Sequence, residues 1–402
     1  MDVAFFSESY LPTRDGVASV VSGLARSLTR LGHTVRVYTP QPVRGAAAEE
    51  VVLDGITVSR VRALPVPYYH EYRWALFPFA QLRSDRFVRD ADVVHLHTPG
   101  VMGGAGFLAA RHWAKPLVGT FHTNVGDMRE SFADSWAVQL FLRAAWIWTL
   151  GTYWRCDVTT APTSAARDTL EHQARKPFRR PVEVVPNGID LERFTPGRSV
   201  PDWRARCGLG DGPLLVYLGR LTTDKGIHRF LDAVERLAPR SDFGAIVGGS
   251  GPEEGSVRER LRATPALAQR VRYVGPVAEE EKGALLAQAD LFVLPSTADT
   301  SSVALLEAMA CGAACVSSNL GGPADLLRDG ETGRLVDVRE DGALAAVLAQ
   351  LLDDDGARER LAAAGEAYAR THGSIEASAR RFISLYELLV QERSLGGRRQ
   401  SG

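Results

Sequence analysis

The stretch LFVLPSTADTSSVALLEAMACG, residues 291–312, decides how the rest of the chain is interpreted. Its first residues, 291–294, form a short apolar run that ends at a proline, which is typical of a buried strand. The residues after Ser302 are strong helix formers and stop at Gly312, so they predict a helix. A loop of small polar residues lies between the two. This order leaves backbone N–H groups and the positive end of a helix dipole where an anion can bind.

Two acids frame this loop. Asp299 precedes the predicted helix, and Glu307 lies about one turn inside it. We expect Asp299 at the mouth of the anion site and Glu307 beside the bound anion. An ordinary amphipathic helix with a capped start is the alternative interpretation of the same residues. The choice depends on motifs elsewhere in the chain.

The length and composition of the chain exclude several classes of protein. A chain of 402 residues is too long for one ordinary core and predicts two α/β domains. Its formal net charge of −1 lacks the basic excess that nucleic-acid binding needs. No apolar run reaches the ~18 residues of a membrane-spanning helix, and the first residues do not resemble a signal peptide. We therefore expect a cytoplasmic protein without a nucleic-acid partner.

The sequence offers no recognisable metal site. The four cysteines have no CxxC spacing and no histidine partners, which favours buried thiols in a reducing compartment. No Asp-x-Asp pair ends a predicted strand. We therefore expect no metal and no other cofactor. The cysteines are Cys156, Cys207, Cys311 and Cys315.

The first forty residues predict the opening βαβ unit of a parallel sheet. An apolar strand over 2–7 is followed by apolar residues at helical spacing over 17–28 and by a second strand over 34–39. Ligands of such sheets bind beyond the carboxyl ends of the strands, where Asp15 and Gly16 lie. Gly16 would let the backbone approach a phosphate, and an ordinary β–α turn is the alternative.

A later strand, predicted over 116–122, ends in Phe-His-Thr-Asn. His122 is therefore expected to face the ligand side of the sheet. Asp127 and Arg129 follow closely and are candidates for an acceptor pocket. A structural role in the core is the alternative for an isolated histidine.

The second domain is predicted to begin with a strand over 214–218. The strand is followed by a glycine, Arg220, Lys225, a second glycine and a helix, an order that favours phosphate binding although it is not a P-loop. Arg220 offers a planar fork to a diphosphate, and Lys225 offers a point charge. Two solvated surface cations are the alternative.

Taken in order, these motifs resemble those of the retaining glycosyltransferases of family 4, which have the GT-B fold. An acid, seven residues and then the Glu of LLEAMACG are similar to the paired-acid signature of that family. SESYLPTRDGV resembles its first loop, and PNGID resembles its crossover between domains. The resemblance covers nearly the whole chain and points to the group of GDP-mannose-dependent α-mannosyltransferases and sulfoquinovosyltransferases.

The resemblance implies an α/β protein with two Rossmann-like parallel-sheet domains that face each other across a cleft. Residues 1–195 would form the acceptor-side domain, and residues 196–373 the domain that binds the nucleotide-sugar. A C-terminal helix over about 374–392 would return to the first domain, and 393–402 would be a flexible tail.

The resemblance also implies roles for individual residues. Asp299 would approach the hydroxyls of the donor sugar, and Glu307 would bind the nucleotide ribose. Arg220 and Lys225 would stabilise the departing diphosphate. The catalytic residues would be His122, Arg220, Lys225 and Asp299; the donor-binding residues Gly16, Val277, Ser302, Val303, Ala304 and Glu307; and the acceptor-binding residues Asp15, Asp127 and Arg129.

This chain departs from the family pattern in its central stretch. The family has Glu at the first acid and Phe-Gly two and three residues later, where this chain has Asp299, Ser301 and Ser302. The identity of the donor sugar therefore stays open. Basic residues are overwhelmingly Arg, which favours a GC-rich, actinobacterial source.

We therefore expect a retaining, metal-independent glycosyltransferase that moves a hexose from a GDP- or UDP-sugar to a hydroxyl of a lipid headgroup or a small molecule. The acceptor would attack the front face within an ion pair and lose its proton to the leaving phosphate. His122 would position the sugar rather than act as a base. A GT-B nucleotide-sugar 2-epimerase and a non-catalytic nucleotide-sugar-binding subunit are the alternatives. A Rossmann dehydrogenase, based on Gly104 and Gly106, is a more distant one.

The segment WAVQLFLRAAWIWTL, residues 136–150, is almost entirely apolar. It is too short to cross a membrane, and a buried core helix is the favoured interpretation. A helix in the membrane interface is the alternative, with the basic residues of 175–180 adding attraction to anionic lipids. Peripheral contact with the inner face of the membrane therefore stays open.

Overall fold

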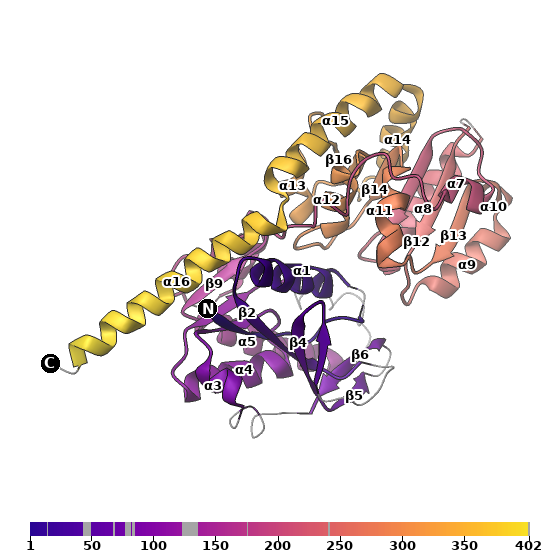
Figure 1. Cartoon of the computed structure of the whole chain (residues 1–402). Helices are drawn as coiled ribbons and strands as arrows, with labels where there is room; N and C mark the ends of the chain where they lie inside the picture. The colour runs from indigo at the N-terminus through magenta and orange to yellow at the C-terminus, as the bar shows by residue number, and fades with distance from the viewer. Residues whose placement is uncertain are drawn as a thin grey trace. The chain divides into compact units, whose positions relative to one another are not determined.

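The computed structural model describes residues 1–13, 15–42, 50–66, 69–76, 82, 85–122, 136–174, 176–239 and 242–400. It divides into two compact units (Figure 1). The first contains Met1–Gly188 and Ile375–Gly402, and the second contains Ile189–Ser374. Each unit has a mainly parallel sheet accompanied by helices. The predicted α/β class with two parallel sheets is therefore confirmed.

The first unit is built around a large sheet. Its strands are β1 (Asp2–Phe6), β2 (Thr34–Pro40), β3 (Glu50–Leu53), β4 (Ile56–Val61), β7 (Val93–Leu96), β8 (Leu117–Thr120), β9 (Val158–Ala161) and β10 (Glu183–Val184). They pair in the order β10-β9-β8-β7-β1-β2-β4-β3, and only β3 and β4 are antiparallel neighbours. The inner strands are buried, as expected where helices cover both faces of a parallel sheet. A separate antiparallel hairpin consists of β5 (Ala63–Val66) and β6 (Tyr69–Ala75).

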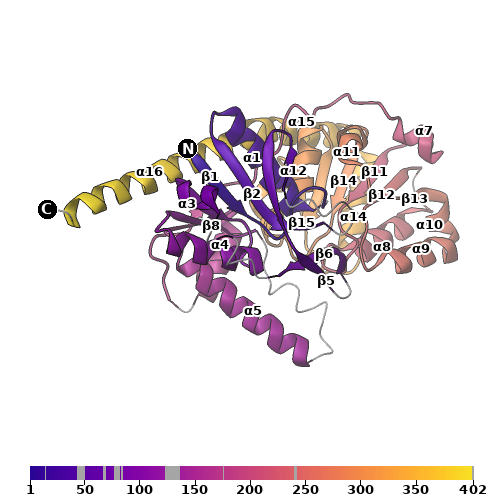
Figure 2. The ribbon, with the colours of Figure 1, turned by 60° about the horizontal axis from the view of Figure 1, so that its bottom comes forward.

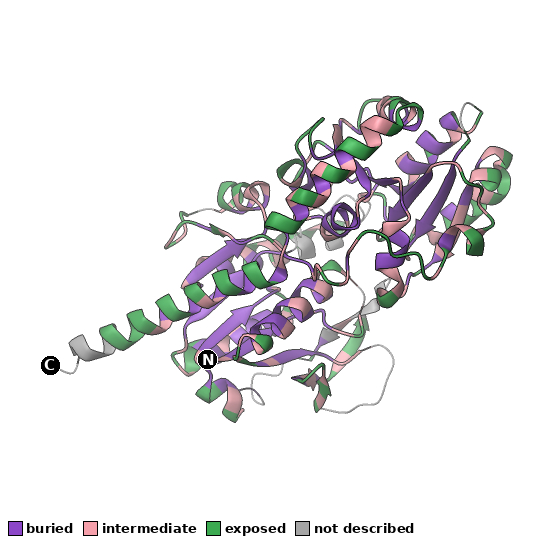
Figure 3. Cartoon of the chain, turned by 45° about the horizontal axis from the view of Figure 1, so that its top comes forward, coloured by how far each residue is buried: buried purple, intermediate pink, exposed green. Residues whose placement is uncertain are grey.

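The last helix of the chain belongs to the first unit. The described helices of this unit are α1 (Gly16–Arg30), α3 (Arg86–Asp90), α4 (Val101–His112), α5 (Trp136–Trp154), α6 (Ser164–Gln173) and α16 (Ile375–Gln400). Ile375, Phe382 and Tyr386 of α16 are buried in one cluster with Val21 and Leu24 of α1. Figure 3 shows buried positions alternating with exposed ones along the part of α16 next to α1. The C-terminal helix therefore completes the core of the N-terminal unit.

The helix α16 is longer than the sequence predicted. We expected a helix end near residue 392 and a flexible tail after it, whereas the helix continues to Gln400. The Arg393 guanidinium lies 3.2 Å from the Asp157 carboxylate, which holds the start of the expected tail against the first unit. The helix includes Gly396 and Gly397, which stand among better helix formers.

The helix α5 differs from the buried core helix that its composition favoured. The helix has the expected position, but Trp136 is 81% exposed, Leu140 60% and Ile147 50%. These residues are four and seven positions apart, so they share one face of the helix. Figure 2 shows α5 at the periphery of the first unit. An apolar composition alone therefore did not predict burial.

The second unit has a six-stranded parallel sheet. Its strands are β11 (Leu214–Leu218), β12 (Gly244–Gly248), β13 (Val271–Gly275), β14 (Leu291–Leu294), β15 (Ala314–Ser318) and β16 (Arg334–Val336). They pair in the order β13-β12-β11-β14-β15-β16. The helices are α7 (Trp203–Cys207), α8 (Ile227–Leu237), α9 (Glu254–Ala263), α10 (Pro265–Arg270), α11 (Glu279–Ala287), α12 (Val303–Ala310), α13 (Gly322–Leu326), α14 (Ala343–Asp353) and α15 (Asp355–His372).

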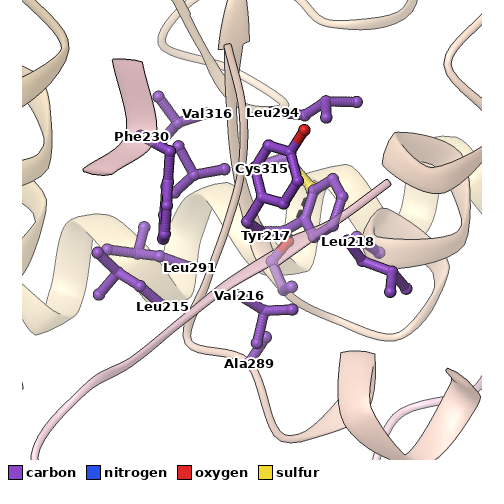
Figure 4. Close-up of a cluster of buried hydrophobic side chains, with 14 of the residues drawn as sticks. Leu215, Val216, Tyr217, Leu218, Phe230, Ala289, Leu291, Leu294, Cys315 and Val316 are labelled. Atoms are coloured by element: carbon purple, nitrogen blue, oxygen red, sulfur yellow. Dashed lines mark hydrogen bonds between the residues drawn. The ribbon is translucent and has the colours of Figure 1, made fainter. Parts of the chain in front are cut away.

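The core of the second unit surrounds its two central strands. Figure 4 shows Tyr217 of β11 with Phe230 of α8 and Leu291 of β14 among the buried side chains. The Tyr217 and Phe230 rings lie 5.6 Å apart, centroid to centroid. Aromatic contacts of this kind hold α8 against β11, and so they help to hold the loop that joins them.

The cysteines form no disulfide bonds. Cys156, Cys311 and Cys315 are buried free thiols, as predicted, whereas Cys207 is only half-buried at the end of α7.

Candidate active site

The strand order of the second sheet reverses between β11 and β14. Loops that follow two such strands diverge, and ligands of open α/β sheets bind at this point. The loop after β11 carries Arg220 and Lys225, and the loop after β14 carries Asp299. The next helix, α12, carries Glu307. The topology therefore gathers these four predicted site residues on two adjacent strand–loop–helix segments.

Hydrogen bonds join the two loops. The Asp224 carbonyl accepts from the Thr297 N–H at 2.8 Å and from the Ser296 hydroxyl at 3.1 Å. Gly226 makes this approach possible, since its φ is +75° and a Cβ atom would collide with the Pro295 carbonyl. The loops therefore form a fixed cradle rather than two independent turns.

Lys225 and Asp299 form an ion pair across this cradle. The Lys225 Nζ lies 2.9 Å from the Asp299 carboxylate and donates to the Ala298 carbonyl at 3.1 Å. Both side chains are mostly buried. The Arg220 guanidinium is more exposed and lies 4.0 Å from the Asp224 carboxylate. The cradle thus contains one cation neutralised by a neighbouring acid and a second cation at its surface.

The N-terminus of α12 lies in the same cradle. Ser302 occupies the N-cap position without capping the helix; its hydroxyl is buried and has no hydrogen-bond partner in the described part of the chain. The Val303 N–H, predicted to bind a phosphate, donates to the Ser301 carbonyl at 3.1 Å. The Ala304 N–H, predicted for the same role, donates to no described residue. Ser302 and Ala304 are therefore the better placed donors for an anion.

Glu307 is buried, and a residue that sequence reasoning missed holds it. The Lys282 Nζ, from α11, lies 3.0 Å from each oxygen of the Glu307 carboxylate and 3.3 Å from Glu279. Burial raises the pKa of Glu307, and the charge of Lys282 opposes that rise. Burial acts to lower the pKa of Lys282, but Glu307 and Glu279 outweigh it, so that pKa is raised.

One oxygen of this pair keeps a free position. Glu307 Oε2 accepts no hydrogen bond from any described residue, although it is buried and close to Lys282.

Two residues of this region can be compared with the predictions from the sequence. A signal for Lys282 existed in the sequence, since it is one of only four lysines in an arginine-rich chain. Val277, the predicted contact to the nucleotide base, lies in the connection between β13 and α11, and its side chain packs toward Gly248. Val277 is buried, and its contact with a nucleotide base stays a prediction.

The first sheet reverses its strand order between β1 and β7. Asp15, in the loop after β1, accepts from the Ala18 N–H at 2.7 Å and from the Ser9 hydroxyl at 2.5 Å. It is thus the N-cap of α1, and its predicted role in acceptor binding stays a prediction. Gly16 follows, and a Cβ atom there would have no neighbour within 4 Å. The space beside Gly16 is open, as an approaching ligand would need.

Glu8, which sequence reasoning did not single out, lies in the same loop. Its carboxyl accepts from the Met102 N–H at 2.5 Å, at the start of α4, and its own N–H donates to the Thr98 hydroxyl at 2.7 Å. Burial raises the pKa of Glu8 to about 7. Glu8 therefore ties the loop after β1 to the loop and helix that follow β7.

His122 lies in a cluster of three buried histidines. Its Nε2 is 3.2 Å from Nδ1 of His97, and the two rings stack with centroids 5.4 Å apart. The His95 ring lies 4.0 Å from the His97 ring. Burial lowers the pKa of His122 to about 4 and the pKa of each other ring well below its usual range. All three imidazoles are therefore neutral near pH 7.

The sequence carried a signal for this cluster. His95 and His97 are two residues apart at the end of one strand, so their side chains share a face of the sheet. Only His122 was predicted. Asp127 and Arg129, the other predicted acceptor residues, lie outside the described residues.

The described part of the chain contains no group of three or more His, Cys, Asp or Glu side chains that could hold a metal ion. None of its helices is both long and apolar enough to cross a membrane.

Family models match both units. Residues 14–193 match the model described as Glycosyltransferase Family 4, and residues 200–368 match Glycosyl transferases group 1. A GDP-mannose-dependent alpha-mannosyltransferase of Mycolicibacterium smegmatis is 31% identical over 98% of this chain and 99% of its own length. A phosphatidyl-myo-inositol mannosyltransferase of Mycobacterium leprae is 31% identical over 93% of each chain.

Solved structures share the fold at lower identity. Sucrose-phosphate synthase from Thermosynechococcus elongatus superposes with a TM-score of 0.79 at 21% identity, covering 97% of this chain and 99% of that one. Anabaena Alr3699/HepE, in complex with UDP and glucose, superposes with a TM-score of 0.76 at 20% identity, covering 96% and 99%.

Proposed function

The chain belongs to glycosyltransferase family 4, has the GT-B fold and is a glycosyltransferase that uses a nucleotide-sugar; from that premise we propose that it is a retaining, metal-independent mannosyltransferase that uses GDP-mannose. The predictions of the family, the fold and the enzyme class are confirmed. The observation that carries the proposal is the full-length similarity to a GDP-mannose-dependent relative, of which the chain covers 99%.

The cradle of the second unit supports a metal-independent mechanism. A donor diphosphate there would meet Arg220, Lys225 and the N-terminus of α12, which together supply positive charge where it grows on the leaving group. The Ala304 N–H and the buried Ser302 hydroxyl would donate to phosphate oxygens. These groups do the electrostatic work that a divalent ion does in other transferases.

Glu307 would bind the ribose of the donor. A carboxylate accepts hydrogen bonds from two vicinal hydroxyls, and Oε2 still has that capacity. Burial raises the pKa of the Glu307 carboxyl, and the charge of Lys282 opposes that rise. The Lys282–Glu307 pair would therefore act in the complex with the donor as well as in the free protein.

The anomeric configuration of the sugar would be retained because the acceptor would attack the anomeric carbon on the same face from which the diphosphate departs. The bond between the anomeric carbon and the diphosphate oxygen breaks, and a bond to the acceptor oxygen forms on the same side. The acceptor proton passes to an oxygen of the departing diphosphate. Asp299 is paired with Lys225 and is suited to orient sugar hydroxyls rather than to form a covalent intermediate.

An inositol-bearing lipid headgroup is the proposed acceptor. Relatives at 30–31% identity carry the names phosphatidyl-myo-inositol mannosyltransferase and D-inositol 3-phosphate glycosyltransferase. The exposed apolar face of α5 would rest in the membrane interface, with Arg143 on the same exposed side. The enzyme would therefore act in the cytoplasm, at the inner face of the membrane.

The test is nucleotide release from GDP-mannose, UDP-glucose and ADP-glucose, with phosphatidylinositol vesicles, with myo-inositol phosphate and without acceptor. Release from GDP-mannose that requires the vesicles, with an α-linked product by NMR, is the expected result. Release that requires only myo-inositol phosphate would show that the acceptor is a soluble molecule rather than a membrane lipid. Conversion of the donor without nucleotide release would replace the proposal with the 2-epimerase alternative.

A further inference from the structure

We propose that Ser302 is a positioning residue of the phosphate site: in the donor complex its hydroxyl caps α12 by accepting from the Leu305 N–H, and the Val303 N–H leaves the Ser301 carbonyl for a phosphate oxygen. The inference rests on the proposed function for the presence of a phosphate at α12. It adds an exchange of hydrogen-bond partners between the free and the bound protein. All the groups involved belong to the second unit.

The backbone turns sharply at the start of α12. In the free protein the Val303 N–H donates to the Ser301 carbonyl at 3.1 Å, across a single residue. That residue, Ser302, has a φ of −83° and a ψ of 85°, close to the values of an inverse γ-turn. The first N–H of the helix is therefore bound to its own loop and is withdrawn from a ligand at the helix N-terminus.

Two buried groups beside this turn have no partner. The Ser302 side chain is 3% exposed, and its hydroxyl makes no hydrogen bond. Leu305, the third residue of the helix, is fully buried, and its N–H donates to no residue in the described part of the chain. Buried polar groups are rarely left unpaired in folded proteins. An N-cap hydroxyl and the N–H three residues later are the two partners of an ordinary helix cap, so one hydrogen bond would satisfy both.

Another helix of the same chain shows the capped arrangement. Thr163, the N-cap of α6, has a φ of −142° and a ψ of 162°, and its hydroxyl accepts from the Ala166 N–H at 3.1 Å. Asp202 and Asp354 cap their helices at ψ values of 101° and 90°, but a carboxylate extends one bond farther than a hydroxyl. The backbone angle at Ser302, and not the chemistry of its side chain, therefore separates α12 from a capped helix.

The two arrangements exchange one paired N–H for another. In the free protein the Val303 N–H is paired, while the Leu305 N–H and the Ser302 hydroxyl are not. In the capped arrangement the last two pair with each other, and the Val303 N–H needs an acceptor from outside the loop. A phosphate oxygen is such an acceptor. Because it binds only the capped arrangement through this N–H, the phosphate shifts the equilibrium toward that arrangement.

The cap gives a reason for the departure of this chain from the family pattern, which has Gly where Ser302 stands. A glycine there leaves the Val303 N–H equally free to turn but offers no side chain to the Leu305 N–H. A serine hydroxyl accepts and donates at the same time. Ser302 can therefore cap α12 and still donate its own O–H to a phosphate oxygen.

The Val303 amide signal tests the exchange directly, in a titration of the full chain with GDP. Labelling with ¹³C′-serine and ¹⁵N-valine selects the valines that follow a serine, and Val303 is assigned by the signal missing from Ser302→Thr. Saturation with GDP should move the Val303 amide proton downfield, as expected for a charge-assisted hydrogen bond to phosphate. An unchanged Val303 signal in the GDP complex would overturn the proposal.

Substitutions of Ser302 separate the cap from a direct contact with phosphate. Ser302→Ala loses the cap that forms only in the complex, so the Kd for GDP should rise about two- to thirtyfold. Ser302→Gly should raise it much less, because glycine is tolerated at an N-cap where alanine is not. An equal rise in both variants would contradict the cap, since each lacks the hydroxyl.

Thr163→Ala is the matched control, because it removes a hydroxyl cap from a helix of the first unit. It should leave the Kd for GDP unchanged. A Kd that rises as much as in Ser302→Ala would mean that loss of any cap weakens binding, which contradicts a specific role of Ser302. Should Ser302→Ala not fold, the titration of the wild-type protein decides.

The outcomes separate this inference from the proposed function. A Val303 shift with UDP but not with GDP would support the cap and contradict the nucleotide named in the proposed function. Binding of GDP without a Val303 shift would contradict the cap and leave the proposed function intact. Binding of neither nucleotide would overturn both, since the cap needs a phosphate.

Discussion

The two units use the same topological position for opposite electrostatics. At the strand-order reversal of the second unit lie two lysine–carboxylate pairs, Lys225–Asp299 and Lys282–Glu307. At the reversal of the first unit lies a cluster of buried, neutral imidazoles around His97. A diphosphate needs charge, whereas sugar and acceptor hydroxyls need oriented, uncharged hydrogen-bonding groups. The comparison teaches that the fold supplies the location and the side chains supply the chemistry.

The largest effect is expected when one charge of the buried Lys282–Glu307 pair is removed. Lys282→Met leaves the Glu307 carboxylate buried without its partner, which should lower the free energy of unfolding of the second unit by about 3–5 kcal/mol. Hydrogen exchange of peptides from β11 and β14, followed in urea, measures this loss.

Two further variants serve as controls for Lys282→Met. Lys115→Met removes a lysine of the first unit and should leave the second unit unchanged. The double variant Lys282→Met/Glu307→Gln should recover part of the stability. A double variant as unstable as the single one would show that lost packing, not the unpaired charge, is the cause.

The second pair should matter for the rate rather than for stability. Lys225→Met removes the charge that we propose to face the leaving diphosphate, so kcat should fall about 10²–10³-fold. Nucleotide release from GDP-mannose in the presence of acceptor measures it, with Lys115→Met as the matched control. A KM effect with an unchanged kcat would mean that Lys225 binds the donor equally in the ground and transition states.

Mild acid should change the stabilities of the two units to different extents. The unfolded chain protonates its histidines below about pH 6.5, whereas His95, His97 and His122 stay neutral in the folded first unit. Each therefore contributes stability that is present above pH 6.5 and is lost toward pH 4, by about 1.4 kcal/mol per pH unit. Glu307 has the opposite sign, since its raised pKa favours the folded state in acid.

Glu8 opposes the imidazoles within the first unit. Its pKa is raised to about 7, so its contribution is present below about pH 4.5 and is lost as the pH rises through 7. Three imidazoles outweigh one carboxyl, and the first unit should lose more stability than the second between pH 6.5 and 5.5. Hydrogen exchange at the two pH values measures this; Glu8→Gln should steepen the loss, and an equal loss in both units would contradict the assignment.

The smallest expected effect is that of metal removal. If Arg220, Lys225 and the α12 N-terminus meet the diphosphate charge as we propose, EDTA should leave kcat within experimental error, and added Mg²⁺ or Mn²⁺ should not raise it. A loss in EDTA that Mn²⁺ restores would place the second unit among metal-assisted transferases.

The sequence predicted the elements better than their contacts. Local spacing and turn residues were sufficient to predict the strand–loop–helix order of 291–312 and the positions of Arg220 and Lys225. The pairing of Lys282 with Glu307 depends on how α11 packs beside α12, which no local pattern encodes. The phosphate role expected of the Val303 N–H overlooked its bond to the Ser301 carbonyl, a detail of one loop conformation.

The first unit was harder to predict for the same reason. His95 and His97 share a face of the sheet, but only the tertiary structure brings His122 and Tyr386 to them. The apolar composition of α5 favoured burial, whereas one of its faces is exposed. Composition does not tell which face of a helix the rest of the chain covers.

The discontinuity of the first unit has a consequence for biosynthesis. Ile375, Phe382 and Tyr386 complete its core, yet they leave the ribosome after the entire second unit. At 5–20 residues per second, a nascent chain would wait about 10–40 s between Gly188 and Ile375. During that interval the inner face of α1 is uncovered and His95 lacks its tyrosine partner. The half that is translated first is therefore the half that finishes folding last, and it is the natural client for a ribosome-associated chaperone.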